Sequence, residues 1–553
     1  MFRIALLAGA SLCVASPLFA QDMITVTEYP ETRREALVES KFGEDIADPY
    51  RWLENDVRND AEVADWVARE NAVTDAYLEG LPATDWFKKT ISELTDYERF
   101  GLPEKAGKRY FYMRNSGLQN QSQLFVQDSL NSARRLLIDP NSWAQDGATA
   151  LADWTPSPDG NYLLYSIQDG GTDWRILRVM DVATGKVLDD EIRWAKFTDL
   201  DWVDEDGFLY SRFPAPEEGE SFQALNYNQQ VYYHRLGTSQ EEDLPVYSTP
   251  DNSKAGHSAQ VSKDRRWAII TSSTGTDARY EVHAIDLRHR QRNGWTARPL
   301  VTGFDNAWNF VASMNGRLFF VTNKDAPRYK VVSVDPTATK LNWETIVEES
   351  DMPIEGASIV GDRLIVSYLK DARTLARILD LNGKPTSEIT LNGIGTASGF
   401  EGKPGDPETF YSFQSFNRPG TIYRMDMKSG KTSVFAQPEL TFNPDDYVVD
   451  QVFFPSKDGT KIPMFIVRNK DLAGSNAPAP TLLYGYGGFD ISLTPTFSAT
   501  RMAWLKAGGV FALANIRGGG EYGKEWHDAG RLNNKQNVFD DFIAAGEYLK
   551  ANG

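Results

Sequence analysis

Cysteine is almost absent from this sequence. Among 553 residues there is one, Cys13, and it lies in an apolar segment at the start of the chain. A single thiol cannot form an internal disulfide bond, so a disulfide-stabilised scaffold is excluded. If the first segment is removed, as its composition predicts, no thiol remains for catalysis either. Stability must then come from packing, and any chemistry from another nucleophile or from a metal.

Histidine and basic residues are scarce as well. The five histidines are His234, His257, His283, His289 and His527. None of them forms an HxxxH or HxH pair with a nearby acid, so a zinc site has little support, and we expect neither metal nor cofactor. The chain has 58 Lys and Arg residues against 77 Asp and Glu, which gives a net charge of −19. Phosphate binding needs clustered basic residues, so nucleic acid is not expected as a partner.

Long hydrophobic runs are missing except at the start, where Ile4 to Val14 follow Arg3. Small residues then continue to Ala20, a pattern typical of a secretory signal peptide. The run is too short to span a bilayer comfortably, and no basic flank follows it. We therefore predict a signal peptide over residues 1–20, no membrane anchor after its cleavage, and a periplasmic or secreted protein. A buried N-terminal helix is the alternative.

The length predicts at least two domains, because single hydrophobic cores stop growing at about 250–300 residues. Residues 21–98 are predicted to be mainly helical. Asp60 to Leu78 has apolar residues at spacings of three and four, which indicates an amphipathic helix with acidic residues near its start. Trp86 to Leu94 repeats the pattern more briefly. These helices need a partner surface elsewhere in the chain.

Between residues 99 and 440, short β-rich runs alternate with Asp-Gly, Asn-Gly and other polar turns. In one unit the turn Ser157 to Gly160 precedes a strand at 161–167 and a second at 174–182. The same order recurs in units that begin near residues 108, 204, 263, 315, 361 and 407. Their spacing of roughly 40–60 residues is typical of propeller blades, which bury their faces against one another in a ring. We predict a seven-bladed β-propeller; an array of β-sandwiches is the alternative.

From residue 441 onwards, strands and helices alternate, which predicts an α/β sheet. The predicted strands cover residues 448–454, 461–467, 481–484 and 509–516, and the third of them is predicted to be short and buried. An amphipathic helix over Val538 to Ala551 follows a glycine-rich loop. In a doubly wound sheet another strand comes after such a helix, so we expect residues 441–553 to form the first part of the domain.

The segment Tyr484 to Phe489 has the sequence Tyr-Gly-Tyr-Gly-Gly-Phe and follows a predicted strand. Glycines at a strand end allow positive φ angles and a close approach of the backbone to a ligand. A tyrosine at such a place can direct its hydroxyl towards a developing oxyanion. A loop of this composition is also compatible with simple packing, and the residues alone leave both interpretations open.

A second glycine-rich segment, Asn515 to Gly523, follows the next strand. It lacks both the GxxxxGK[ST] order and the GxGxxG spacing before a helix, so nucleotide binding is not predicted. His527 is the histidine nearest to it in the sequence. We do not assign it as a general base, because an α/β-hydrolase has its base histidine after the nucleophile and the acid.

Several segments together resemble the prolyl oligopeptidase family. They are 452–467, 483–489, 514–523 and 534–542 near the end of the chain, 29–30, 33–34, 48–54 and 66–71 near its start, and 115–121, 126–130 and 231–238 between them. The resemblance implies a seven-bladed β-propeller joined to an α/β-hydrolase domain, on which the N-terminal segment packs. It also implies cleavage of short peptides after proline, by acyl transfer through a Ser, Asp and His triad without metal or cofactor. A monomer is expected.

The resemblance assigns roles to three residues of this chain. Tyr486 is expected to donate its hydroxyl to the oxyanion, and Phe489 to line the pocket for the proline ring. Phe197 is expected to contribute an aromatic side chain from the propeller to the substrate cavity.

The sequence departs from the family pattern in one respect. The family's nucleophile lies in a Gly-x-Ser-x-Gly elbow after the helix that corresponds to Val538 to Ala551, and the 553 residues contain no such pentapeptide. Gly256 to Gln260 comes nearest and belongs to a predicted propeller blade. No triad residue can be assigned, and we expect these 553 residues alone to be inactive.

Two alternatives to a proline-specific peptidase remain. One is the related peptidase that cleaves after Arg or Lys, in which the loop after the first parallel strand usually has a different sequence. The other is a propeller that binds its partner without catalysis.

Overall fold

The computed structural model describes residues 28–145, 147–217, 221, 224–474 and 477–552. The predicted signal peptide, residues 1–20, and Cys13 lie outside the described residues. The chain divides into two compact units that meet between Thr90 and Ile91. In the described part, none of the helices is both long and apolar enough to cross a membrane.

The first unit contains a hairpin and a long helix. Its elements are β1 (Val38–Lys41), β2 (Glu44–Ala47), the 3-10 helix η1 (Arg51–Glu54) and α1 (Ala61–Glu79), and α2 (Thr84–Thr95) continues from it into the second unit. Both helices agree with the predicted ranges to within two residues. Asp60 starts α1 as its N-cap, because its carboxylate accepts hydrogen bonds from the backbone N–H groups of Glu62 and Val63.

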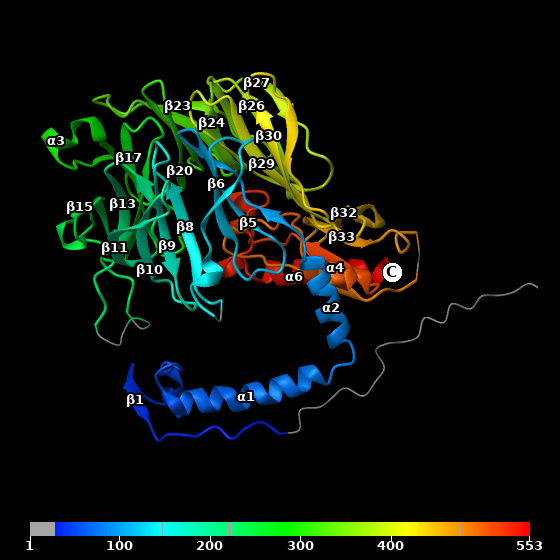
Figure 1. Ribbon diagram of the computed structural model, residues 1–553. Helices are drawn as coiled ribbons and strands as arrows, with labels where there is room; N and C mark the ends of the chain where they lie inside the picture. Colours follow the sequence, from blue (N-terminus) through cyan, green and yellow to red (C-terminus); the bar gives the residue numbers. More distant parts are fainter. Residues whose placement is uncertain (1–27, 146, 218–220, 222–223, 475–476, 553) are drawn as a thin grey trace, which may run out of the picture. The chain divides into compact units, whose positions relative to one another are not determined.

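The second unit begins with a propeller of antiparallel blades, which are numbered 1 to 7 below (Figure 1). Blades 2 and 3 belong to one eight-stranded sheet, because Ala195 pairs with Arg212. Blade 1 consists of β3 (Arg99–Phe100), β4 (Glu104–Ala106), β5 (Arg109–Asn115), β6 (Gln123–Gln127) and β7 (Arg135–Ile138); blade 2 of β8 (Ala150–Pro156), β9 (Tyr162–Gln168), β10 (Arg175–Asp181) and β11 (Val187–Ala195); blade 3 of β12 (Asp201–Trp202), β13 (Gly207–Arg212), β14 (Gln230–Arg235) and β15 (Leu244–Tyr247). Blade 4 consists of β16 (Ala255–Val261), β17 (Trp267–Thr274), β18 (Glu281–Asp286) and β19 (Arg298–Val301); blade 5 of β20 (Trp308–Met314), β21 (Arg317–Thr322), β22 (Lys330–Val334) and β23 (Trp343–Val347). Blade 6 consists of β24 (Ile354–Val360), β25 (Arg363–Lys370), β26 (Arg373–Leu379) and β27 (Pro385–Ile389); blade 7 of β28 (Thr396–Glu401), β29 (Glu408–Ser415), β30 (Arg418–Asp426) and β31 (Thr432–Ala436).

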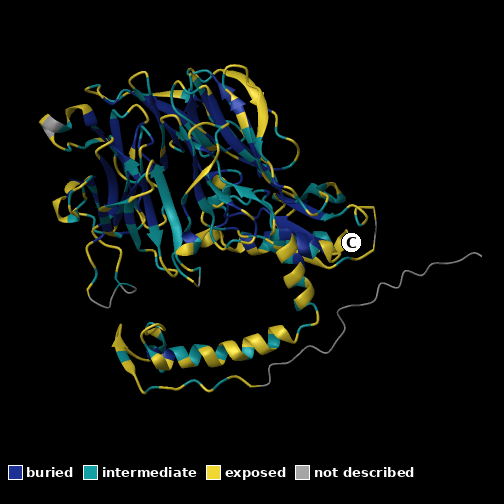
Figure 2. Ribbon diagram, in the orientation of Figure 1, coloured by how far each residue is buried: buried dark blue, intermediate teal, exposed yellow. Residues whose placement is uncertain are grey.

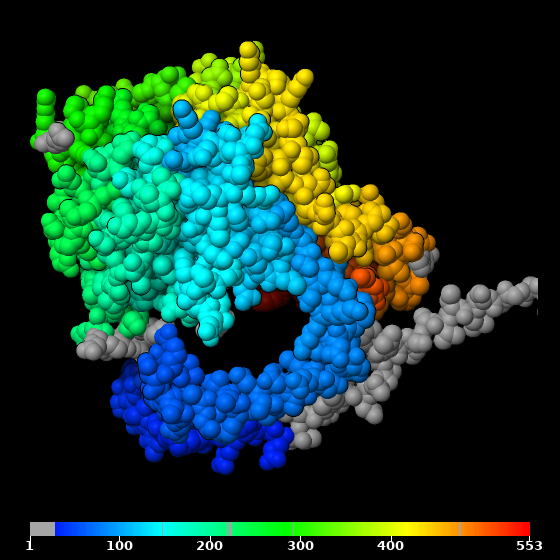
Figure 3. Space-filling view, viewed as in Figure 1, coloured from blue at the N-terminus to red at the C-terminus, as the bar shows by residue number. Residues whose placement is uncertain are grey.

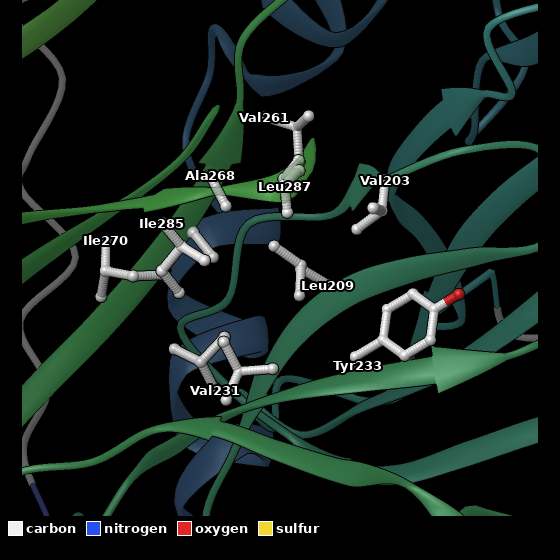
Figure 4. Close-up of a cluster of buried hydrophobic side chains, with 11 residues drawn as sticks. Val203, Leu209, Val231, Tyr233, Val261, Ala268, Ile270, Ile285 and Leu287 are labelled. Carbon is white, nitrogen blue, oxygen red and sulfur yellow. The ribbon is translucent and has the colours of Figure 1, made fainter. Parts of the chain in front are cut away.

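Hydrophobic side chains fill the spaces between neighbouring blades. Figure 2 shows that the central strands of the propeller are the buried ones. Between blades 3 and 4, Leu209 and Val231 belong to one cluster with Ile270 and Ile285, and all four are at most 1% exposed (Figure 4). Burial of each such side chain stabilises the fold by about 1.5–3 kcal/mol. The blades are therefore held together by layers of apolar side chains.

The ring is closed by side chains between blades 1 and 7. In the described part each blade consists of strands that are consecutive in the sequence, so these two blades exchange no strand. Instead, the Tyr110 hydroxyl donates a 2.5 Å hydrogen bond to Glu408, and the Tyr110 ring packs edge-on against Phe410 with centroids 6.2 Å apart. Arg424 forms an ion pair with the same Glu408 carboxylate. Figure 3 shows the surfaces of the first and last blades side by side.

Substitution of Tyr110 by Phe tests this closure. We expect the free energy of unfolding to fall by about 1–3 kcal/mol, because a buried carboxylate loses a hydrogen bond. Urea unfolding followed by circular dichroism measures the change. Tyr162→Phe, which alters a half-buried tyrosine of blade 2, serves as the control. Equal stability of Y110F and the wild type would contradict the role of this hydrogen bond.

A buried histidine joins blades 2 and 3. His234 Nδ1 lies 2.6 Å from Asp243 Oδ1, and its Nε2 lies 3.0 Å from Asp190 Oδ1. The Tyr210 hydroxyl donates a 2.5 Å hydrogen bond to Asp243, and the backbone N–H of Gly237 donates one of 2.6 Å to Asp190. Burial by itself lowers the pKa of His234, but the hydrogen bonds and charges of the two carboxylates outweigh it and raise the pKa to about 9.

The raised pKa of His234 predicts a pH dependence of stability. Its contribution is complete below the unfolded pKa of about 6.5 and is lost as the pH rises through about 9, with a total on the order of 3 kcal/mol. Thermal unfolding at pH values from 6 to 10 measures this loss. In His234→Gln the stability should be lower at pH 6 and should depend less on pH. If the stability of the wild type and of His234→Gln falls equally between pH 6 and 10, His234 is not the cause of the pH dependence.

The propeller is followed by a four-stranded sheet in the order β32-β33-β35-β34, in which β34 and β35 are parallel and the other pairs antiparallel. Its strands are β32 (Tyr447–Pro455), β33 (Lys461–Asn469), β34 (Thr481–Tyr484) and β35 (Val510–Ala514), and its helices are α4 (Ala499–Lys506), α5 (Lys524–Asp528) and α6 (Gln536–Ala551). Phe454, Met464, Ala512 and Val538 are part of its core. The predicted strands and the last helix are present, but the sequence analysis did not predict α4 or α5.

The predicted strand over residues 481–484 is present as β34. Within the described residues it pairs with β35, and its Leu482 and Tyr484 side chains are 49% and 45% exposed, so these residues do not show the burial that was predicted for the strand.

Blades 5 to 7 dock directly onto the α/β part. The Tyr522 hydroxyl donates a 3.0 Å hydrogen bond to Asp371 in the β25–β26 turn, and the amide of Gln451 donates one of 2.5 Å to the carbonyl of the same residue. The N–H of Lys524 donates to the Pro327 carbonyl at 2.9 Å. These contacts place the glycine-rich loop after β35 next to blades 5 and 6.

Candidate active site

Tyr486 and Phe489 lie together in the loop that follows β34. Tyr486 is 43% exposed and Phe489 71% exposed, and their ring centroids are 6.5 Å apart. Phe489 has a φ of +54° and Asp490 a φ of +59°. Left-handed backbone costs roughly 1–2 kcal/mol for a residue with a side chain, so other contacts must hold this pair in place. Backbone strain of this kind clusters at active sites and ligand-binding sites, so this loop is a candidate for one.

The absence of side chains at Gly487 and Gly518 lets two loops touch. A Cβ atom at Gly487 would lie 2.6 Å from Val538 Cγ1, and one at Gly518 would lie 2.5 Å from the Gly487 carbonyl oxygen. The ammonium group of Lys535 also donates a 2.8 Å hydrogen bond to that carbonyl. The glycines of the two predicted motifs thus bring the Tyr486 loop against the loop after β35.

Arg517 anchors the second of these loops from within the protein. Its guanidinium donates hydrogen bonds of 2.6 and 3.0 Å to the two oxygens of Asp541 on α6, and one of 2.6 Å to Asp458. The hydroxyl of Ser456 donates to Asp541 at 2.6 Å. The hydrogen bond from Arg517 holds the pKa of Asp458 well below its usual range. The arginine and Asp541 are almost fully buried, so this pair fixes the start of the loop firmly.

Arg517→Met removes the charge and leaves the Asp541 carboxylate buried without its partner. We expect a loss of about 3–5 kcal/mol in the free energy of unfolding, which urea unfolding measures. The control is Arg418→Met, which breaks a solvent-exposed pair with Asp445 and should cost about 1 kcal/mol or less. If the two variants lose similar amounts of unfolding free energy, Arg517 stabilises the protein no more than an exposed ion pair does.

Glu521 joins the two loops at a further point and was missed by the sequence analysis. It is 1% exposed, and its Oε1 accepts a 2.9 Å hydrogen bond from the N–H of Leu493 and one of 3.1 Å from the amide of Asn515. Burial raises the pKa of the Glu521 carboxyl. The only sequence signal was a carboxylate within a glycine-rich run, which also fits a solvent-exposed turn.

The propeller contributes two adjacent cavities. Phe197, with a φ of +51° and 56% exposure, lines a cavity of about 650 Å³ in blades 2 to 5. A second cavity of about 420 Å³ is lined by Tyr329 and Glu355 from the propeller and by Asp490 from the Phe489 loop. Asn309 and Phe310 line both cavities. The structure therefore brings Tyr486 and Phe489 together and places Phe197 on the wall of the adjoining propeller cavity.

The interior of the propeller carries acidic residues. Asp153, Asp199, Asp201 and Glu401 line a third cavity of about 370 Å³, together with Lys263. Burial raises the pKa of Asp153, Asp199 and Glu401. Within the described residues, no three His, Cys, Asp or Glu side chains are grouped so that they could hold a metal ion.

The residues that most nearly match a nucleophile elbow lie elsewhere. Gly256 to Gln260 are part of strand β16 in blade 4. His257 in this segment is buried, with its ring nitrogens 2.8 Å from Ser272 Oγ and 3.1 Å from Thr249 Oγ1. This is a packed strand and not the sharp strand-to-helix turn that a nucleophile elbow requires.

A propeller of seven blades joined to a sheet of α/β-hydrolase order defines the architecture of a propeller-containing serine peptidase. Residues 29–438 match the family described as prolyl oligopeptidase, N-terminal beta-propeller domain, and residues 495–553 match the prolyl oligopeptidase family. The chain belongs to the prolyl oligopeptidase family.

Individual relatives cover nearly the whole chain. The prolyl endopeptidase of Elizabethkingia meningoseptica is 37% identical over 96% of this chain and 74% of its own length. That of Dictyostelium discoideum is 32% identical over 94% of this chain and 77% of its own length. This chain thus spans about three quarters of the length of these relatives.

Solved structures that resemble this chain also belong to prolyl endopeptidases or oligopeptidases. One solved structure has a sequence that is 50% identical to this chain, with a TM-score of 0.70 over 95% of this chain and 75% of the other. It comes from a study of two prolyl endopeptidases and of the role of inter-domain dynamics in their catalysis and specificity. Prolyl oligopeptidase B from Galerina marginata, bound to a 35mer substrate, is 29% identical, with a TM-score of 0.86 over 95% of this chain and 77% of the other.

Proposed function

We propose that the protein is a serine oligopeptidase that hydrolyses short peptides on the carboxyl side of proline. The observation that carries this proposal is the pairing of Tyr486 with Phe489 on a loop held against α6 and the loop after β35. The names of the relatives support it, since those described above are prolyl endopeptidases or a prolyl oligopeptidase.

The exposed side chains of the loop suit the two parts of this reaction. When a serine Oγ attacks the carbonyl carbon of the proline residue and gives up its proton to a base, a C–O bond forms and the carbonyl oxygen becomes an oxyanion, which the Tyr486 hydroxyl stabilises as a hydrogen-bond donor. Collapse of this intermediate expels the amine, and water then hydrolyses the acyl-enzyme. The Phe489 ring packs against the proline ring. The 553 residues contain no Gly-x-Ser-x-Gly pentapeptide, so we assign the nucleophile to none of them.

The propeller cavities provide room for the rest of the peptide. A volume of about 650 Å³ next to Phe197 falls in the range of sites that enclose small ligands, which favours peptides over folded proteins. The apolar start of the sequence supports export, so the protein is proposed to act in the periplasm or outside the cell, as a monomer. The packing of residues 21–98 on the hydrolase part stays a prediction.

Tyr486→Phe tests the oxyanion donor. In a version of the protein that carries the complete catalytic triad, kcat on a proline reporter peptide should fall by about 100- to 1,000-fold, because one donor to the oxyanion is lost. Tyr484→Phe, which removes a hydroxyl two residues before Tyr486, is the matched control and should change kcat little. A Y486F enzyme with nearly full activity would remove Tyr486 from the mechanism.

Paired reporter peptides test the specificity. We expect release of the reporter after Pro and not after Arg, because the Phe489 ring offers an apolar surface to the residue before the scissile bond. Phe489→Ala should raise KM for the proline peptide, as expected when a contact made throughout the reaction is lost. Preferred cleavage after Arg would instead support the Arg- or Lys-specific alternative, in which Asp490 and Glu355 would face a basic side chain.

A further inference from the structure

We propose that His527 is a positioning residue that holds the Phe489–Asp490 backbone in the conformation that presents the Phe489 ring. This inference deepens the proposed function and rests on it for the role of Phe489. From its place in the sequence His527 was not expected to be a general base, and the function proposed above gives it no role.

The ring of His527 lies between the two loops that form the site. Its Nδ1 is 2.7 Å from the Gly518 carbonyl oxygen, and the N–H of Asp490 approaches the same nitrogen at 3.0 Å. The Asp490 N–H also lies 3.3 Å from the Gly518 carbonyl oxygen. With a proton on Nδ1 the ring donates to Gly518, and without it the ring accepts from Asp490. In either state His527 connects the backbone next to Phe489 with the glycine-rich loop.

The histidine acts at the point where the loop is strained. Phe489 and Asp490 both have left-handed φ angles, which side-chain-bearing residues adopt only when their surroundings enforce them. His527 belongs to α5, and the N–H of Lys524 at the start of that helix donates to the Pro327 carbonyl of the propeller. The short helix is therefore itself fixed, so that it can hold the strained pair in place.

Charged groups next to His527 support the same arrangement. The Asp490 carboxylate, Lys524 and Asp528 all lie close enough to interact electrostatically around this point. Tyr329 of the propeller lines the second cavity together with Asp490. Asp490 is held through its backbone by α5, while the Phe489 side chain remains free to contact a ligand.

Hydrogen–deuterium exchange of the 553-residue chain tests the positioning without any need for catalysis. In His527→Ala the amides of residues 486–493 should exchange at least about five-fold faster, the factor expected when one hydrogen bond is lost. His527→Asn should restore slow exchange, because its amide lies near the Nδ1 position and can bond to both backbone groups. His527→Gln, which carries its amide near the Nε2 position, should not. The control is His289→Ala at an exposed site of the propeller.

Kinetics on a version with the complete catalytic triad complete the test. His527→Ala should raise KM for a proline peptide by about five-fold or more and change kcat less, because a misplaced Phe489 weakens binding throughout the reaction. His527→Asn should return KM towards the wild-type value. A merely structural defect would lower kcat and stability together and would not distinguish Asn from Gln.

The two proposals fail in different ways. If Phe489→Ala leaves KM unchanged, the proposed proline pocket is wrong, whatever the exchange data show. If Phe489→Ala raises KM but His527→Ala changes neither KM nor the exchange of residues 486–493, the inference about His527 is overturned. Faster exchange across the whole second unit in every His527 variant would also overturn it. If His527→Ala does not fold, the His527→Asn and His527→Gln variants are compared instead. Slow exchange of residues 486–493 in the Asn variant alone supports the proposal, and equal exchange in the two variants overturns it.

Discussion

The buried contact between Arg517 and Asp541 is the interaction on which the arrangement of the site depends. It joins the loop after strand β35 to helix α6, and the side chains of both partners are at most 5% exposed. A buried ion pair of this kind gives little net stability, but the loss of one partner is costly, so the geometry is strongly enforced. The loop that begins at Arg517 then supplies the Gly518 carbonyl, against which Gly487 and Asp490 are placed. The position of both aromatic rings follows from that sequence of contacts.

Much of this architecture could be predicted from the sequence, and the reasons are local. Alternating apolar residues and Asp-Gly turns indicated the strands of each blade, and Asp60 marked the start of α1. The outermost strands of blades 6 and 7 were not predicted, because most of their residues are exposed. Pro385–Ile389 and Thr432–Ala436 have almost no buried positions, so their sequences show no regular alternation of apolar residues. The role of Glu521 was not predicted for a different reason: the sequence around a carboxylate within a glycine-rich segment does not indicate whether its side chain is buried.

The candidate site was predictable only in part. The glycines marked residues 484–489 as a loop of interest, but the roles of Tyr486 and Phe489 were predicted only from the resemblance to the prolyl oligopeptidase family. The structure shows that Gly487 is needed for the close contact of two loops. The contacts that fix this loop come from residues far along the chain, such as Lys535 and His527. Contacts between distant segments are set by tertiary structure and leave no periodic pattern in the sequence.

Because each blade consists of consecutive strands, the ring has no position at which the two ends of the propeller are woven together. The junction between blades 1 and 7 has no connecting peptide, and groups such as Tyr110 and Glu408 join the two blades there. Joining residues 99 and 436 by a linker and opening the chain between any other two blades would leave every blade's hydrogen-bond ladder intact. The propeller is in this sense circularly permutable: the order of its blades around the ring is fixed, but the choice of the first one is not.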